Sequence, residues 1–232
     1  MRLDVYLQRH KDITRTKGLE LIKNGDVLVN EQVIIKPSYL VKETDEVVII
    51  NSFKYVSRAG LKLEDAITSF NLDFKDKVVI DVGSSTGGFT DCSLKYGAKL
   101  VYSYDVGTDQ MDESLRNDHR IKLFENTNIL SVSNLMGDII LIDVSFTSVL
   151  PIIKHLKNSA EMFVILYKPQ FEVGKTNLKK GIVKDNKVVE KRLKEAINEI
   201  TDFGIKIVNY KKANIKGKKG NQEYILIGVK NA

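Results

Sequence analysis

Short apolar segments alternate with helical segments along most of this chain, and this alternation limits its fold more than any other feature. Helical patterns at Gly87–Tyr96, Met111–Arg116, Ser148–Lys157 and Lys187–Phe203 separate most of the apolar segments. Because crossovers between parallel strands need a helix, the pattern favours a mostly parallel sheet covered on both faces. We therefore predict an α/β domain with a seven-stranded sheet over residues 54–232. The predicted strands are Val78–Val82, Leu100–Tyr104, Ile121–Phe124, Ile139–Ile142, Met162–Tyr167, Ile205–Asn209 and Tyr224–Val229.

Residues 1–53 follow a different pattern of short elements. Two helical segments, RLDVYLQRH and TRTKGLELIKNG, precede short strands around VLVN, QVII and EVVII. Asn24-Gly25 and Asn30-Glu31 are typical turn residues between these elements. We predict a small α+β domain, joined to the larger one by a short linker near Asn51–Tyr55.

Composition narrows the class of protein. The chain has 232 residues, 43% of them hydrophobic, which is enough for a full core. No stretch approaches the roughly 18 to 20 apolar residues of a membrane span, and the N-terminus lacks the apolar core of a signal peptide. The single cysteine, Cys92, excludes a disulfide framework, and three scattered histidines form no metal-ligand cluster. We therefore expect a cytoplasmic protein without a metal site.

The positive charge is concentrated in the last third of the chain. Residues 1–53 hold eight basic and eight acidic residues, whereas residues 151–232 hold 18 basic and 8 acidic ones. A basic excess near a candidate active site favours a polyanionic partner such as nucleic acid. Lysine-rich surfaces also serve solubility, so charge alone leaves both explanations open.

The segment VVIDVGSSTGGFTDC places a turn of small residues between the first strand of the larger domain and a helix. In doubly wound sheets a ligand lies at this point. The turn has neither the three-glycine spacing of a dinucleotide site nor the Gly-Lys-Ser/Thr of a phosphate loop. Asp105, 24 residues after Asp81, stands where a carboxylate commonly binds ribose hydroxyls. These features fit a nucleoside without phosphate, and S-adenosylmethionine is the predicted cofactor. The alternative is that Asp81 only caps the helix.

The sequence makes two kinds of methyl acceptor less favoured. Enzymes that methylate exocyclic amines carry an Asn/Asp-Pro-Pro-aromatic run where this chain has IDVSF, ending at Phe146. Methylation of pyrimidine carbon-5 needs a nucleophilic cysteine, but Cys92 reads as a packed small residue. A ribose 2′-hydroxyl is a very weak acid, so methyl transfer to it would need a base such as a lysine. The polar candidates near strand ends are Lys62, Asp143, Lys168 and Glu223. The alternative for each lysine is a surface side chain paired with an acid.

Taken together, these segments resemble the TlyA (hemolysin A) family, whose catalytic domain is FtsJ-like and has a seven-stranded Rossmann-like methyltransferase sheet. The resemblance covers essentially the whole chain and rests on YVSRAGLKLEDA, DVGSSTGGFTDC, VYSYDVG, DVSFTSVLP, KPQFEVG, GIVKD and GNQEY. It implies methyl transfer from S-adenosylmethionine to cytidine 2′-hydroxyls of ribosomal RNA, with rRNA or ribosomal subunits as partners. The family's catalytic tetrad maps onto Lys62, Asp143, Lys168 and Glu223, with Lys168 as the base. The implied cofactor residues are Asp81, Gly83, Ser84, Ser85, Gly87, Gly88, Phe89, Asp105, Val106, Asn128 and Asp143.

The first fifty residues resemble the alpha-L RNA-binding motif shared by a small-subunit ribosomal protein and pseudouridine synthases. The matching segments are RLDVYL and TRTKGLELIKNGDVLVNEQVIIKPS. The lysine cluster Lys211–Lys219 could hold phosphates beside the ribose, or could be a solvated loop. The predicted RNA-binding residues are Arg2, Arg15, Lys17, Lys23, Arg58, Lys216 and Lys218.

Two other functions are carried as alternatives. A membrane-lytic, hemolysin-like protein would need an amphipathic or apolar insertion segment, and none is evident in the sequence. An RNA-binding ribosome assembly factor without catalysis would share the cofactor and RNA features, so only an activity measurement separates it from a methyltransferase.

Overall fold

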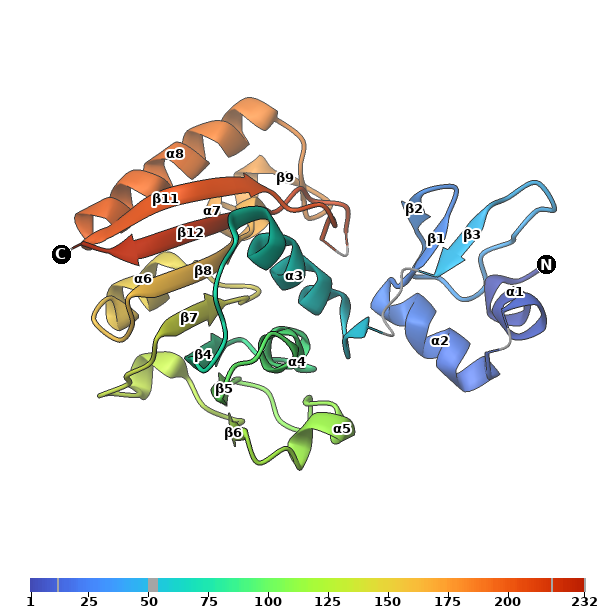
Figure 1. Ribbon diagram of the computed structural model, residues 1–232. Coiled ribbons are helices and arrows are strands. Elements are labelled where there is room, and N and C mark those ends of the chain that lie inside the picture. Colours follow the sequence, from blue (N-terminus) through green and yellow to red (C-terminus); the bar gives the residue numbers. More distant parts are fainter. Residues whose placement is uncertain (12, 50–53, 218, 232) are drawn as a thin grey trace. The chain divides into compact units, whose positions relative to one another are not determined.

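The computed structural model describes residues 1–11, 13–49, 54–217 and 219–231. The chain divides into two compact units, Met1–Lys54 and Tyr55–Ala232 (Figure 1). Across the described residues, no helix is both long enough and apolar enough to span a bilayer.

The N-terminal unit packs two helices, α1 (Leu3–His10) and α2 (Arg15–Asn24), with a small three-stranded sheet. Its strands are β1 (Val27–Val29), β2 (Gln32–Val33) and β3 (Val47–Ile49), in the order β2-β1-β3. Gly25 ends α2 with φ +75°, and Asn30 and Glu31 both have positive φ in the two-residue turn between β1 and β2. Both predicted turns are therefore confirmed. The buried core consists of Leu3, Leu7, Leu21, Ile22, Val27, Val29, Val41 and Val47.

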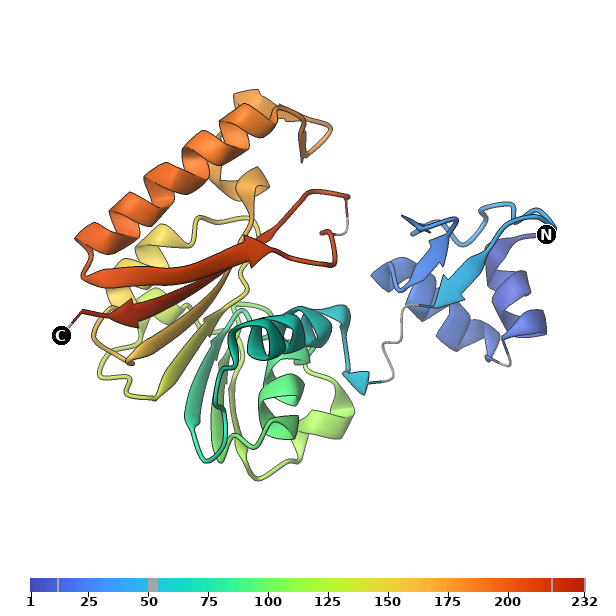
Figure 2. The same cartoon turned by 45° about the horizontal axis from the view of Figure 1, so that its top comes forward.

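The larger unit is built on a seven-stranded mixed sheet in the order β11-β12-β8-β7-β4-β5-β6, which confirms the predicted fold class (Figure 2). Six strands run in the same direction, and β12 alone among these seven runs antiparallel to its neighbours β8 and β11. The chain moves from β4 outward to β6 and then returns to β7 on the other side of β4. The strands are β4 (Val78–Val82), β5 (Leu100–Tyr104), β6 (Ile121–Phe124), β7 (Ile139–Ile142), β8 (Met162–Tyr167), β11 (Ile205–Lys212) and β12 (Tyr224–Lys230).

Hydrophobic clusters cover both faces of this sheet, as the near-continuous apolar strands predict. Ile80 and Ile140 face one cluster, whereas Val79 and Leu141 face the other, because successive strand residues point to opposite faces. Helices α6 (Leu150–Leu156) and α8 (Asn186–Asp202) pack on the first face. Helices α3 (Arg58–Phe70) and α4 (Gly88–Lys95) pack on the second. Each fully buried aliphatic side chain contributes about 1.5–3 kcal/mol.

Helix α3 was not among the predicted helices, although its sequence has the required pattern. Leu63, Ala66 and Ile67 follow helical spacing and are buried against α4. Asn71 ends the helix in the left-handed conformation, with φ 50°. This helix carries Lys62 toward the carboxyl ends of the strands.

The remaining elements of the larger unit are short. The helix α7 directly follows β8, and its first residue comes immediately after Lys168. A hairpin of β9 and β10 follows α7, and neither element was predicted. The bounds are α5 (Glu113–Arg116), η2 (Ile129–Ser131), α7 (Pro169–Glu172), η3 (Lys175–Asn177), β9 (Leu178–Lys179) and β10 (Ile182–Val183).

Candidate functional site

The turn after β4 has a backbone that depends on glycine. Gly83 has φ +84°, and a Cβ placed there would stand 2.7 Å from the carbonyl oxygen of Asp143. Gly87 has φ +91°, and a Cβ there would stand 2.5 Å from Met111 Sδ. Any larger residue would therefore be strained and would also clash. The turn is a fixed loop seated directly against the end of β7.

Asp105 holds this loop from the end of the neighbouring strand. Its two carboxylate oxygens accept hydrogen bonds from the backbone N–H groups of Ser85, at 2.8 Å, and Gly107, at 2.7 Å. The next residue, Val106, is 71% exposed. A carboxylate and an exposed apolar side chain thus stand beside the glycine turn, as a ribose with an attached base would require.

Asp81 lies beneath the loop and not on its surface. It is fully buried, and Thr90 Oγ1 donates a 2.7 Å hydrogen bond to its Oδ2. Burial raises the pKa of Asp81 to about 7, and the nearby carboxylates of Asp143 and Asp105 add to the increase. Within the described part of the chain, Asp81 Oδ1 has no hydrogen-bond partner. The buried carboxyl therefore lies under the loop, and Oδ2 is its hydrogen-bonded oxygen.

Of the other predicted cofactor residues, some are exposed near the loop and others are buried. Ser85 is exposed and Ser84 is buried, whereas Gly88 begins α4 against Ser57 and Ala59. Phe89 is 4% exposed and belongs to the hydrophobic core, so its side chain does not line the open loop. Asn128 is exposed and caps η2, with its Oδ1 accepting from Leu130 N at 3.0 Å.

Asp143 and Lys168 meet at the acceptor side of the site. Lys168 Nζ lies 2.6 Å from Asp143 Oδ1 and donates a 3.0 Å hydrogen bond to Ser145 Oγ. Lys168 is only 8% exposed. Because β7 and β8 are parallel neighbours, the residues that follow them reach the same edge of the sheet. The predicted convergence of strand ends brings these two side chains together.

A second ion pair completes the predicted tetrad. Lys62 Nζ, on α3, donates to Glu223 Oε2 at 2.5 Å, and Gln170 Nε2 donates to Glu223 Oε1 at 3.3 Å. Tyr224 pairs with Tyr167 in the antiparallel ladder of β12 and β8. Glu223 and Lys168 are therefore the next residues along these paired strands. The structure thus gathers all four side chains at one end of the sheet.

Three residues near this site were missed in the sequence. Ser145 binds Lys168, Gln170 binds Glu223, and Phe146 is 90% exposed with φ +67°. The Phe146 ring packs on Phe171, with ring centroids 5.3 Å apart. A large exposed aromatic side chain in a left-handed conformation is unusual, and this makes the loop a candidate part of the site. Its position directly after IDVS is the signal that could have identified it.

Among the predicted RNA-binding residues, Arg2 and Arg15 share one anchor. Both guanidinium groups bind the buried carboxylate of Asp4, Arg2 Nε at 2.9 Å and Arg15 Nη2 at 3.3 Å. The side chains of Arg2 and Arg15 are 50% and 58% exposed, so their remaining donors face solvent. Lys17 and Lys23 lie on α2.

The remaining predicted RNA-binding residues lie in the larger unit, and one of them is buried. Arg58 is 7% exposed, because the start of α3 packs into the core, so it is not presented to a nucleic acid. Lys216 is exposed in the loop between β11 and β12, and Lys218 lies outside the described residues. Lys211, the first residue of the Lys211–Lys219 cluster, forms a 2.8 Å ion pair with Asp65 of α3.

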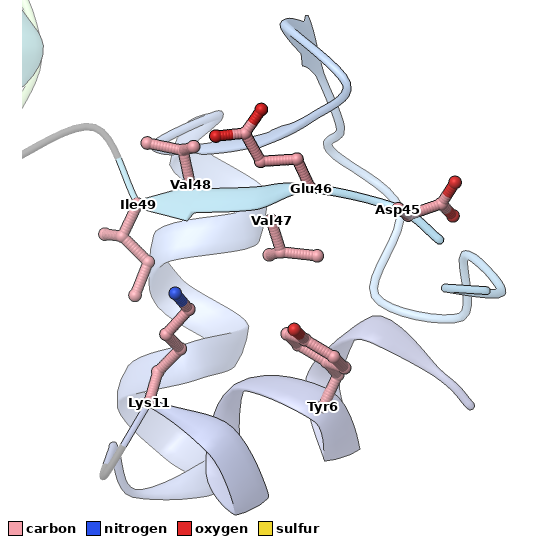
Figure 3. A pocket seen from close by; sticks show the side chains of 7 residues that line it. All are labelled: Tyr6, Lys11, Asp45, Glu46, Val47, Val48 and Ile49. Atoms are coloured by element: carbon pink, nitrogen blue, oxygen red, sulfur yellow. The ribbon is translucent and has the colours of Figure 1, made fainter. Parts of the chain in front are cut away.

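A groove on the N-terminal unit lies apart from these arginines, between α1 and the sheet strand β3 (Figure 3). Val47 and Ile49 point toward α1, whereas Glu46 and Val48 point the opposite way. Tyr6 and Lys11 line the helical side, and Asp45 closes one end. Its mixed charge does not match a phosphate-binding surface.

Comparison with known proteins gives consistent results for both units. Residues 55–230 match the FtsJ-like methyltransferase family, and residues 1–47 match the S4 domain. The chain is 42% identical over 235 residues to Hemolysin A of Brachyspira hyodysenteriae, covering 97% of this chain and 98% of that protein. It is 35% identical over 254 residues to the 23S rRNA (cytidine-2′-O)-methyltransferase TlyA of Campylobacter jejuni, covering 100% of both chains. A solved structure from Streptococcus thermophilus superposes with a TM-score of 0.78 at 34% identity, covering 100% of this chain and 88% of that one.

Proposed function

Since this chain belongs to the TlyA (hemolysin A) family of FtsJ-like methyltransferases, we propose that it methylates cytidine 2′-hydroxyls of ribosomal RNA with S-adenosylmethionine as the methyl donor. One observation carries the proposal. Asp143 touches the glycine loop through its backbone carbonyl, at the Gly83 position, and binds Lys168 through its carboxylate. A cofactor on the loop and a base at the strand end would therefore be neighbours.

The residues around the glycine turn fit this cofactor. The Asp105 carboxylate can accept bonds from ribose hydroxyls through its remaining lone pairs, and exposed Val106 offers an apolar contact for adenine. The turn carries no lysine, in keeping with a ligand that has no phosphate. The unused Oδ1 of buried Asp81 is a further acceptor beneath the turn. When bound, S-adenosylmethionine supplies an electrophilic methyl group on a positively charged sulfur.

Lys168 is the proposed base. In its neutral form it accepts the proton that the ribose hydroxyl must lose, and the Asp143 carboxylate stabilises the ammonium that forms. Ser145 holds the amine from a second direction. The Lys62–Glu223 pair, linked to α7 through Gln170, would orient the ribose beside it. The buried positions of Lys168 and Glu223 keep these interactions strong because water is largely excluded.

Phe146 is proposed to hold the base of the target nucleotide. Its ring stands free in solvent, four residues beyond the end of β7 and supported behind by Phe171. Unpaired RNA bases stack readily on such rings, each stack contributing about 1–3 kcal/mol. The N-terminal unit would add phosphate contacts through Arg2 and Arg15.

The direct test is methyl transfer to unmodified ribosomal subunits. The purified protein is incubated with each subunit and labelled S-adenosylmethionine, and ribose methylation is mapped by mass spectrometry. We expect label on the 2′-oxygen of cytidine. Transfer that continues on RNA in which the target ribose is 2′-deoxy, or no transfer to either subunit, would contradict the proposal.

A further inference from the structure

Two chain segments on the acceptor side of the site contact each other at several successive positions, and these contacts form a seam. The first runs from Asp143 to Val149, and the second comprises Lys168 and α7. Lys168 binds Asp143 and Ser145 at one end of this seam. The rings of Phe146 and Phe171 meet in the middle. At the far end the second segment contributes one side chain, that of Glu172.

Glu172 is almost completely enclosed, with its side chain 1% exposed. Its Oε1 accepts a 2.8 Å hydrogen bond from Val149 N, and its Oε2 accepts one of the same length from Ser148 Oγ. Val149 is the N-cap residue of α6, so the carboxylate caps this helix from another element. Arg192 of α8 approaches Glu172 Oε2 to 3.9 Å and donates to its backbone carbonyl at 3.2 Å. Burial raises the pKa of Glu172, so a carboxylate here costs free energy that these contacts must offset.

The segment that Glu172 holds is strained at its centre. Phe146 has φ +67° while its ring is 90% exposed, so packing of the ring alone cannot maintain this conformation. The segment keeps its shape because both ends are tied, one to Lys168 and the other to Glu172. We infer that Glu172 is a positioning residue for methyl transfer, because it fixes the loop that presents Asp143, Ser145 and Phe146 to the acceptor. This inference rests on the proposed function.

Activity and cofactor binding are measured first, in the full chain. Glu172→Ala removes both acceptors, and Glu172→Gln can keep one bond to Val149 and one to Ser148. Glu199→Ala is the matched control, because Glu199 binds the same Arg192 at 2.6 Å but, among the described residues, forms no hydrogen bond or ion pair with the 143–149 segment. We expect kcat of Glu172→Ala to fall at least about tenfold, since a misplacement of about 1 Å can cost roughly a hundredfold. Glu172→Gln should recover most of the loss, and S-adenosylhomocysteine affinity should stay within about twofold.

A second measurement does not depend on activity. The chain has no tryptophan, so Phe146→Trp introduces a single fluorescent reporter at the loop. With Glu172→Ala added, this tryptophan should show lower anisotropy and stronger acrylamide quenching than with Glu199→Ala added. Circular dichroism and the melting temperature establish that each variant is folded. If Glu172→Ala does not fold, Ser148→Ala removes one of the two bonds and takes its place.

The outcomes separate this inference from the proposed function. Loss of kcat with unchanged cofactor affinity and a more mobile reporter supports the positioning role. An active Glu172→Ala variant with the parent's kcat, or a reporter as rigid as in the Glu199→Ala background, overturns it. If the parent protein itself transfers no methyl group, the proposed function fails, while the reporter still tests whether Glu172 holds the loop.

Discussion

Asp143 and Lys168 follow the carboxyl ends of the neighbouring parallel strands β7 and β8 and form an ion pair of 2.6 Å. The glycine turn starts from the same end of the sheet, after β4. Asp143 is the residue that both halves of the site share. Its carbonyl closes the space above Gly83, and its carboxylate orients the amine. The chemistry proposed for this chain depends on that double contact.

Replacing Lys168 with alanine should abolish methyl transfer while leaving the cofactor site intact. General base catalysis contributes roughly 10²–10⁴-fold, so we expect at least about a hundredfold loss in kcat. Labelled methyl transfer to ribosomal subunits measures the rate, and calorimetry with S-adenosylhomocysteine measures binding. Lys157→Ala, an exposed lysine at the end of α6, is the control. Parent-level activity in Lys168→Ala would remove this residue from the role of base.

Replacing Asp105 with alanine should weaken cofactor binding. The change removes the proposed ribose acceptor and leaves the N–H groups of Ser85 and Gly107 without their acceptor. Hydrogen bonds to a charged group contribute about 1.5–3 kcal/mol, which corresponds to a roughly 10- to 150-fold weaker Kd. Asp109→Ala lies in the same loop and is 94% exposed, so its Kd should stay near that of the parent. Equal affinity in the two variants would argue against a ribose contact at Asp105.

Asp4→Asn should weaken RNA binding even though it removes a negative charge and so raises the net charge of the chain by one. The buried carboxylate orients Arg2 and Arg15, and the neutral amide cannot hold both guanidinium groups. A surface that acted through net charge alone would instead bind RNA more tightly. Filter binding at several salt concentrations decides between the two, with Arg9→Ala, an exposed residue of α1, for comparison. Tighter binding by Asp4→Asn would show that the arrangement of the arginines does not matter.

Asp81 should make the stability of the protein depend on pH in a predictable direction. Its pKa is raised from 3.8 to about 7, mainly by burial. Between pH 4 and 7 the unfolded chain therefore loses this proton while the folded protein retains it, and the free energy of unfolding decreases as the pH rises. Asp81→Asn has no such proton to lose. The free energy of unfolding of Asp81→Asn, relative to that of the parent, should therefore increase as the pH rises from 4 to 7. Urea unfolding at steps of one pH unit gives the free energy of unfolding of both proteins. If this free energy changes with pH equally in the two proteins, the raised pKa is contradicted.

Local patterns were sufficient to predict the sheet and the turn. Five of the seven strands begin and end where predicted, because strands of a sheet that is covered on both faces are mostly apolar. The positive φ of Gly83 and Gly87 follows in the same way from the small residues of the turn. The three residues that β11 has beyond the predicted strand, Tyr210, Lys211 and Lys212, carry polar groups on an edge strand and so gave no apolar signal.

Long-range packing decided what the local pattern could not. Lys62 and Glu223 are 161 residues apart in the sequence and meet because α3 lies beside the end of β12. Burial of Arg58 and the place of Asp81 beneath the loop likewise depend on neighbours from other elements, whereas Asn128 caps η2 through a local bond to Leu130 N. Sequence by itself determined which segments are strands and where a ligand turn interrupts them, since both are short-range properties of a chain. Tertiary structure alone decided which charges face one another and which ring stands exposed, because those outcomes are set by contacts between distant residues.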